Sequence, residues 1–199
     1  MGDDRAVLRQ SLRNARRDLS PSYRVGAANR LAANLLALPC APVRGHVAGY
    51  WAMDGEIALH TWQLALPEDC VYCLPVLRGD CLQFAPWRPG DGLVSNRYGI
   101  PEPDVSPDAL LAPHHLSMVV VPLVGFDVTG ARLGMGGGWY DRTFASRQQQ
   151  AAPPWLIGAA FDMQRLDTIE TATWDVALDA VCTEATTHHS LARPAASPT

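Results

Sequence analysis

The sequence predicts one α/β domain in three layers (α/β/α), with a mostly parallel sheet between helices. Segments with helical spacing of apolar residues alternate with short, β-branched apolar runs. The 199 residues suit one domain, and 48% of them are apolar, which can fill a substantial core. A glycine-rich loop follows one apolar run and precedes a helix-like segment, as loops at the carboxyl ends of parallel strands do.

Two helices are expected to open the chain. Over residues 4–19, four apolar side chains recur at helical spacing, and four arginines form a second stripe beside them. These arginines either bind an anionic ligand or form a solvated basic face. The apolar stripe is Leu8, Leu12, Ala15 and Leu19, and the basic stripe is Arg5, Arg9, Arg13 and Arg16. The second helix is predicted from the Ser20–Pro21 cap to about Leu38.

Short strands and two further helices are expected to follow. The strands are predicted at 46–52, 71–77, 81–85, 118–124, 156–161 and 179–183, and the helices at 59–66 and 140–148. The proline- and glycine-rich stretch 86–117 is either a loop lining a ligand site or an ordinary surface excursion. Residues 185–199 are rich in Ala, Pro, Ser and Thr, so we expect a disordered tail after a domain of residues 1–184.

The composition excludes several functions. All sixteen basic residues are arginine, so a Walker A loop and a Schiff-base lysine are excluded, and phosphate chemistry must use arginine, backbone amides and metal. The net charge of −4 argues against a generic nucleic-acid binder. No apolar run approaches the roughly 20 residues of a membrane span, and the acidic N-terminus does not fit a signal peptide. A cytoplasmic protein is therefore expected.

The five cysteines are expected to be reduced. Cys70 and Cys73 form a CxxC motif within a strand-like run, without a second CxxC or a HxxxH motif. Buried structural thiols are therefore favoured over a zinc or redox site.

The stretch from Arg132 to Arg142, RLGMGGGWYDR, is the most informative in the chain. It places four glycines in five positions between an apolar run and a helix-like segment. Backbone N–H groups of such a loop can converge on a phosphate. The alternative is a tight turn that needs positive φ at several positions.

Several segments, in order along the chain, resemble the 5-formyltetrahydrofolate cyclo-ligase (5,10-methenyltetrahydrofolate synthetase) family. The family pattern is a PLxxFD strand end followed by G-x-RLGxGxGxYDR, which corresponds to residues 121–127 and 132–142. Further correspondences are the arginine-rich first helix, Met53–Ile57, Gly99–Pro103 and Trp174–Asp179. The resemblance runs from about residue 5 to 184 and implies the NagB/RpiA/CoA transferase-like form of the α/β fold.

The resemblance implies a ligase that uses ATP and Mg²⁺ to close 5-formyltetrahydrofolate into 5,10-methenyltetrahydrofolate, releasing ADP and phosphate. In the family, the formyl oxygen is thought to accept the γ-phosphoryl group, after which N10 attacks the formyl carbon and phosphate leaves. Phosphorylation turns the formyl oxygen from a poor leaving group into a good one, so the protein mainly positions reactants and stabilises charge. A monomer acting on small molecules, and not on nucleic acid or membranes, is implied.

The resemblance also implies residue roles. Residues matching the nucleotide-binding positions are Arg5, Arg9, Gly134, Met135, Gly136, Gly137, Gly138, Trp139 and Tyr140. Residues matching the Mg²⁺-associated aspartates are Asp141 and Asp175. The residues expected to bind the folate are Met53, Glu56 and Tyr140. The residues expected to be catalytic are Arg132, Tyr140 and Asp141. Without the resemblance, Asp141 could cap a helix, Asp175 could serve a turn, and both aromatics could pack in the core.

Two positions depart from the family pattern. Gly137 stands where some members carry lysine, so one phosphate cation is missing from the loop, and Arg132 or Arg142 is expected to compensate. Trp139 stands where Tyr or Phe is usual. Two other functions remain open at this point. One is a related sugar-phosphate isomerase or CoA transferase, and the other is a non-catalytic binding module, although a metal–nucleotide site explains Asp141 and Asp175 better.

Overall fold

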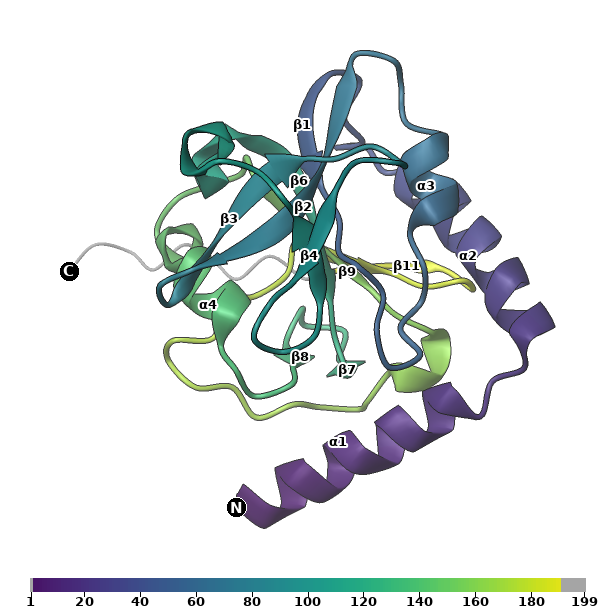
Figure 1. The fold of residues 1–199 in the computed structure, drawn as a ribbon. Helices are drawn as coiled ribbons and strands as arrows, with labels where there is room; N and C mark the ends of the chain where they lie inside the picture. Colours follow the sequence, from purple (N-terminus) through teal and green to yellow (C-terminus); the bar gives the residue numbers. More distant parts are fainter. Residues whose placement is uncertain (1, 191–199) are drawn as a thin grey trace.

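A seven-stranded sheet forms the centre of the computed structural model, which describes residues 2–190 (Figure 1). The five inner strands run parallel, and each edge strand pairs antiparallel with its neighbour. The prediction of an α/β domain with a mostly parallel sheet is therefore confirmed. From edge to edge the strands are β11 (Thr187–His189), β10 (Ala180–Cys182), β9 (Trp155–Ala159), β6 (Leu116–Pro122), β1 (Gly45–Ala48), β2 (Cys70–Arg78) and β3 (Cys81–Pro86).

Helices and loops cover both faces of this sheet. The helices are α1 (Gly2–Arg17), α2 (Pro21–Leu36), α3 (His60–Leu64) and α4 (Trp139–Thr143). On one face, α2 packs Leu31 and Leu35 in a core that includes Met118 of β6. On the other face, Phe144, directly after α4, packs in a second core with Val119 of the same strand. Neighbouring residues of β6 thus point to opposite cores, as the alternation of side chains along a strand requires.

Local sequence signals explain where α2 begins. The hydroxyl of Ser20 accepts a hydrogen bond from the Tyr23 N–H, and Pro21 occupies the first turn, as predicted. The fourth helix is shorter than the predicted span 140–148, because α4 gives way to a 3₁₀ turn at Ala145–Gln148.

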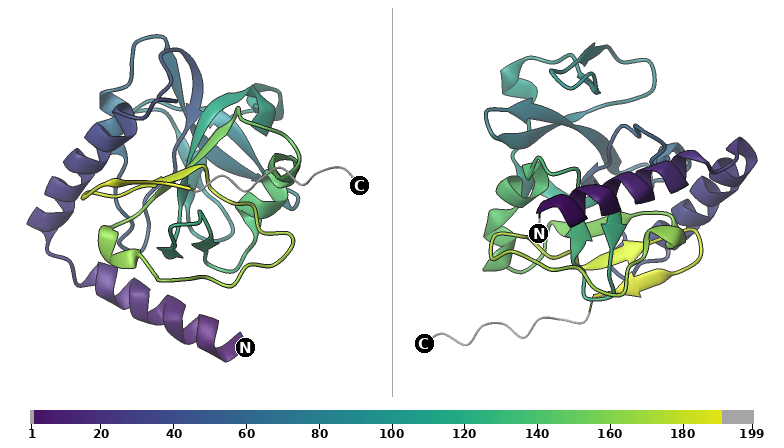
Figure 2. Two further views of the ribbon diagram at one scale, coloured as in Figure 1. Left: turned by 180° about the vertical axis from the view of Figure 1, so that it is seen from behind. Right: turned by 90° about the horizontal axis from the view of Figure 1, so that it is seen from below.

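The first helix differs from the prediction in which side chains it buries. Leu12 packs with Val124 and Leu133, but Leu8 remains 36% exposed. Arg16 is instead completely buried. In Figures 1 and 2, α1 extends along one side of the molecule, away from α2.

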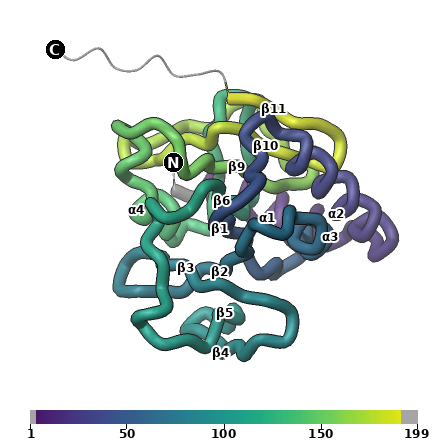
Figure 3. The backbone as a smooth tube through the Cα atoms, turned by 90° about the horizontal axis from the view of Figure 1, so that it is seen from above, coloured from purple at the N-terminus to yellow at the C-terminus, as the bar shows by residue number. Residues whose placement is uncertain are grey.

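Three other segments correct the sequence-based expectations. The stretch 86–117 contains a hairpin of β4 (Leu93–Ser95) and β5 (Pro101–Pro103), which Figure 3 shows beyond the β2–β3 edge. The glycine loop does not follow β6 directly, because β7 (Gly125–Phe126) and β8 (Arg132–Leu133) intervene as a hairpin. The tail was predicted to be disordered from residue 185, which is wrong for Thr187–His189, since β11 pairs with β10. Residues 191–199 of that tail lie outside the described residues.

The chain order creates a switch point in the sheet. From β1 the chain passes to β2 on one side and later returns to β6 on the other side. Ligand crevices of open α/β sheets lie at the carboxyl ends of strands at such a point. Among residues 2–190, no helix combines the length and apolar character needed to cross a membrane.

Candidate active site

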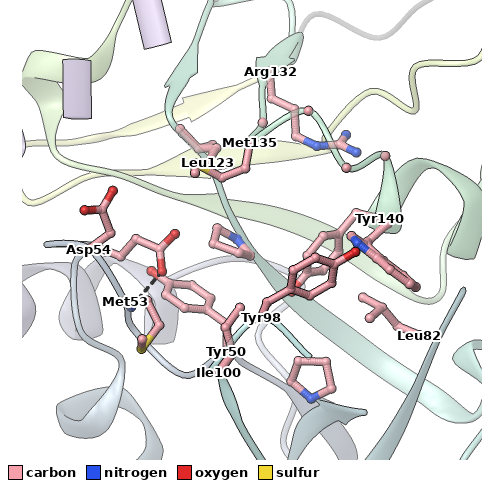
Figure 4. A pocket seen from close by; sticks show the side chains of 18 of the residues that line it. Tyr50, Met53, Asp54, Leu82, Tyr98, Ile100, Leu123, Arg132, Met135 and Tyr140 are labelled. Atoms are coloured by element: carbon pink, nitrogen blue, oxygen red, sulfur yellow. Dashed lines mark hydrogen bonds between the residues drawn. The ribbon is translucent and has the colours of Figure 1, made fainter. Parts of the chain in front are cut away.

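A cavity of about 460 Å³ lies at the carboxyl ends of β1, β2 and β6 (Figure 4). Tyr50 follows β1, Leu77 lies near the end of β2, and Leu123 follows β6. In Figure 4, Met53 and Asp54 lie on one side of the pocket, and Arg132 and Tyr140 on the other. Every residue predicted for the site lines this cavity: Arg5, Arg9, Met53, Glu56, Arg132, Gly134, Met135, Gly136, Gly137, Gly138, Trp139, Tyr140, Asp141 and Asp175.

The arginine helix reaches the glycine loop. The Nε of Arg9 donates to the carbonyl oxygen of Gly134 at 2.8 Å, and its guanidinium lies close to Gly136. Burial and the charge of Arg5 lower the pKa of Arg9. Within the described residues, neither arginine has a carboxylate within salt-bridge distance, so two cations face this end of the pocket without a counter-charge.

Two of the four glycines in the glycine loop are required by the backbone conformation. Gly136 and Gly138 adopt φ values of 94° and 63°, which L side chains rarely adopt. Gly134 and Gly137 do not lie in this region, so the tight-turn explanation accounts for only half of the glycines. Gly138 also occupies the N-cap position of α4, without a side-chain cap.

Asp141 is held by a neighbouring strand and a distant loop. Its Oδ1 accepts from Nη2 of Arg132 at 2.5 Å and from the Val176 N–H at 3.0 Å. Arg132 also donates to the Val176 carbonyl. The carboxylate therefore ties β8 to the segment that carries Asp175, and it does not cap α4.

Asp175 directly precedes Val176, which contacts both Asp141 and Arg132, and one of its own carboxylate oxygens accepts a hydrogen bond. Its Oδ2 accepts from the Ala172 N–H at 2.8 Å, which closes a local turn. Within residues 2–190, Oδ2 of Asp141 and Oδ1 of Asp175 have no hydrogen-bond donor. Each aspartate thus has one oxygen without a protein donor, and carboxylate oxygens are the kind of ligand that Mg²⁺ prefers. Residues 2–190 contain no group of three or more His, Cys, Asp or Glu side chains arranged to hold a metal ion.

A tight turn positions the opposite side of the pocket. Asp54 and Gly55 adopt φ values of 51° and 77°, and the Glu56 N–H donates to the Met53 carbonyl at 2.9 Å. Asp tolerates this left-handed region better than most residues. Arg13 and Arg16 fix the turn, because both donate to Oδ2 of Asp54, at 2.6 and 3.1 Å.

Glu56 is a carboxyl group at this side, and its side chain is only 14% exposed. Its Oε2 accepts from the Met53 N–H at 2.9 Å, and Nη2 of Arg16 lies 3.8 Å from its other oxygen. Burial raises the pKa of Glu56, and the hydrogen bond from Met53 and the charge of Arg16 oppose this rise. Burial likewise raises the pKa of Tyr140 well above its ordinary value, so its phenol remains a neutral donor.

Several pocket residues were not predicted from the sequence. Arg16 belongs to the basic stripe of the first helix and Asp54 to the segment Met53–Ile57, but their pairing is visible only in the fold. Asn96, Tyr98 and Ile100 come from the stretch whose function was left open, and Trp174 lies beside Asp175 in a matching segment. Pro122 and Leu123 begin the PLxxFD motif, but no role in the site was predicted for them. Pro75, Leu77 and Leu82 gave no signal, because apolar strand residues look the same whether they line a pocket or a core.

The cysteines lie outside this pocket. All five are free thiols, and burial raises the pKa of Cys73 to about 12 and that of Cys182 to about 11. The CxxC motif lies within β2. High thiol pKa values disfavour the thiolate form that redox chemistry and metal binding require.

Comparisons with known proteins identify relatives of this chain. A family model described as the 5-formyltetrahydrofolate cyclo-ligase family matches residues 1–184. The 5-formyltetrahydrofolate cyclo-ligase of Escherichia coli K12 is 34% identical over 177 residues, covering 86% of this chain and 96% of the relative. That of Mycolicibacterium smegmatis is 33% identical over 192 residues, covering 90% and 93%.

Solved structures give the same result at the level of the fold. The structure of Aquifex aeolicus 5,10-methenyltetrahydrofolate synthetase superimposes with a TM-score of 0.79 at 25% identity, covering 98% of this chain and 96% of that one. The synthetase from Mycoplasma pneumoniae shares the fold, with a TM-score of 0.68 at 22% identity, covering 91% and 99%. The chain therefore belongs to the 5-formyltetrahydrofolate cyclo-ligase family of enzymes.

Proposed function

We propose that this protein catalyses the ATP- and Mg²⁺-dependent cyclisation of 5-formyltetrahydrofolate to 5,10-methenyltetrahydrofolate, with release of ADP and phosphate. The observation that carries the proposal is one pocket that joins an arginine-flanked glycine loop to a mostly buried carboxyl group in apolar surroundings. Family membership favours this reaction over a sugar-phosphate isomerase, a CoA transferase or a non-catalytic module. We also propose that the protein acts as a cytoplasmic monomer on small molecules.

The glycine-loop side is proposed to bind the triphosphate. Arg5 and Arg9 supply positive charge, and backbone N–H groups between Gly134 and Gly138 can approach phosphate oxygens without side-chain obstruction. Arg9 has a second task, because its hydrogen bond to the Gly134 carbonyl fixes where the loop begins. Burial and then the charge of Arg5 lower the pKa of Arg9, and an anion bound beside both guanidinium groups would offset these effects.

Asp141 and Asp175 are proposed to hold Mg²⁺, which would neutralise phosphate charge when bound. Arg132 donates to one oxygen of Asp141 and thereby orients the carboxylate, leaving the other oxygen for the cation. This arrangement makes Arg132 a positioning residue, since its charge is already matched by Asp141.

The Glu56 side is proposed to bind the pterin and its formyl group. Glu56, whose pKa is raised by burial, can exchange hydrogen bonds with the pterin ring, and Met53 contributes apolar contact. Tyr140 lines the pocket next to Asp141 in sequence, so its neutral phenol is placed to donate a hydrogen bond where the two substrates meet.

The chemistry then proceeds in two steps. The formyl oxygen attacks the γ-phosphorus and ADP leaves. N10 next attacks the formyl carbon and releases its proton to solvent, and the C–O bond breaks as inorganic phosphate departs with the former formyl oxygen. Positioning of the two substrates and stabilisation of phosphate charge are the tasks left to the protein.

Oxygen labelling tests this order of events. With 5-formyltetrahydrofolate carrying ¹⁸O in the formyl group, the released phosphate should contain one ¹⁸O atom, measured by mass spectrometry. An unlabelled phosphate, with the label in water, would mean that the formyl oxygen is never phosphorylated.

A further inference from the structure

The indole of Trp139 fills the space beside Gly137. A Cβ atom added at Gly137 would lie 2.8 Å from Cδ1 of Trp139, closer than real Cβ atoms approach, and 3.0 Å from Nε1, which is also a tight contact. Because Gly137 does not have a positive φ, the constraint on this position is steric and not conformational. A side chain at position 137 and the present placement of Trp139 therefore exclude each other.

The same indole carries a guanidinium group from a distant part of the chain. The Cζ of Arg97 lies 5.1 Å from the centroid of the Trp139 ring and 5.3 Å from that of Tyr98. The Tyr98 and Trp139 rings themselves lie 6.1 Å apart, edge to face. A guanidinium held on aromatic rings keeps its N–H donors available for a ligand at its edge.

Among residues 2–190, Arg97 differs from Arg132 and Arg142 in donating to no protein acceptor. Arg132 is engaged by Asp141 and by the Val176 carbonyl. Arg142 lies 5.1 Å from the Trp139 ring, but its Nε donates to the Asp80 carbonyl at 2.7 Å. Over residues 2–190, the guanidinium of Arg97 has neither a hydrogen-bond acceptor nor a carboxylate partner.

We propose that Arg97 is a phosphate-binding residue of this enzyme and supplies the cation that its lysine-free glycine loop lacks. Trp139 has two effects on this arrangement. Its indole leaves no room for a side chain at Gly137, and it forms the aromatic surface against which the guanidinium of Arg97 packs. The neighbouring residues Asn96 and Tyr98 line the pocket, so Arg97 lies at its rim. The inference rests on the proposed ATP-dependent function and adds a residue to its triphosphate site.

The contribution of Arg97 to phosphate binding is measured with tripolyphosphate, an anion that lacks the adenosine of ATP. Calorimetric titrations use Mg-ATP and tripolyphosphate with the wild type, Arg97→Gln and Arg97→Lys. The Gln variant should bind both ligands about tenfold more weakly, while the Lys variant should recover most of this loss. The KM for 5-formyltetrahydrofolate should change less than about twofold, since that site does not use the charge.

The matched control is Arg88→Gln, which removes an exposed arginine outside this pocket and should leave both affinities unchanged. If the wild type binds both ligands and Arg97→Gln binds them equally well, the role of Arg97 is refuted while the proposed function stands. If the wild type binds neither ligand, the triphosphate site itself is refuted, and the proposed function falls with it.

A second experiment tests the exchange between Trp139 and a side chain at position 137. The double substitution Gly137→Lys with Trp139→Tyr removes the steric conflict and places a charge on the loop itself. In this background, Arg97→Gln should weaken tripolyphosphate binding less than about twofold. A full tenfold loss in the double variant would show that Arg97 does not act as the substitute for a loop cation.

Discussion

Asp141 makes structural contacts and is also proposed as a metal ligand. One of its oxygens accepts from Arg132 and from the Val176 N–H, while the other faces no donor within the described residues. Asp141→Asn keeps the shape but removes the charge, so turnover should fall by at least about 100-fold with Mg-ATP. The measurement is the rate of methenyltetrahydrofolate formation by the folded variant.

A matched ion pair outside the pocket provides the control. Asp179 accepts from Arg147 at 2.7 Å and also from the Leu156 N–H, much as Asp141 accepts from Arg132 and Val176. Asp179→Asn should lower the melting temperature and leave the turnover of the folded protein near wild type. Near-normal turnover of Asp141→Asn would assign that carboxylate a structural role only.

Arg9 should act on the nucleotide more than on the folate. Arg9→Ala removes a cation and the hydrogen bond to the Gly134 carbonyl, so the KM for ATP should rise about tenfold, with a smaller change in the KM for 5-formyltetrahydrofolate. Arg30→Ala, on the exposed side of α2, is the control and should change neither constant. A change confined to the folate KM would place Arg9 in the other half of the pocket.

At the scale of elements, α1 is held by charge more than by apolar contact. Arg13, Arg16 and Arg17 all pair with Asp54 in the turn after β1, while Leu8 is partly exposed. Asp54→Asn leaves the buried Arg16 with only the more distant carboxylate of Glu56, 3.8 Å away, and should lower the free energy of unfolding by about 2 kcal/mol. This value is below that of a fully buried pair, because the Asp54 side chain is 21% exposed. Denaturant unfolding checks it, and an unchanged midpoint would contradict it.

The same ion pairs predict an acid-sensitive attachment of α1. Burial alone would raise the pKa of Asp54, but the hydrogen bonds from Arg13 and Arg17 and the charges of Arg13 and Arg16 outweigh burial and lower the pKa. A lowered folded-state pKa contributes stability above the ordinary pKa of aspartate, and this stability is lost as pH falls through the folded-state value. Unfolding measured between pH 7 and pH 3 should show this loss in the wild type and a smaller one in Asp54→Asn. Equal pH profiles would exclude this contribution of Asp54.

Elements with strong local signals could be predicted, and those made by tertiary pairing could not. Ser20 and Pro21 marked the start of α2, and β-branched runs marked β6 and β9 within about two residues. The strand β11 has no such signal, because its backbone is ordered by pairing with β10. The short β7–β8 hairpin was not predicted from the sequence, because it too is defined by the pairing of its strands. It determines where the glycine loop starts.

At the scale of the whole molecule, the sequence predicted a set of residues that line one pocket, but not their side-chain partners. The predicted site residues from Arg5 to Asp175 all line this pocket, since the switch between β1 and β6 brings their segments together. Three side-chain pairings could not be predicted, because each joins residues that are 9 to 42 positions apart in the sequence. They are Arg132 with Asp141, Arg16 with Asp54, and Arg97 with Trp139. Such side-chain pairings follow from the packed fold and have no local signature.

The central claim is that this pocket joins ATP to 5-formyltetrahydrofolate chemistry. The most direct measurement incubates the full chain with 5-formyltetrahydrofolate, ATP and Mg²⁺ and follows the near-UV absorbance of 5,10-methenyltetrahydrofolate. We predict that product forms in a one-to-one ratio with ADP and that omission of ATP, or chelation of Mg²⁺, abolishes its formation. Folded protein that forms no product with all three present, or equal product without ATP, would contradict the account.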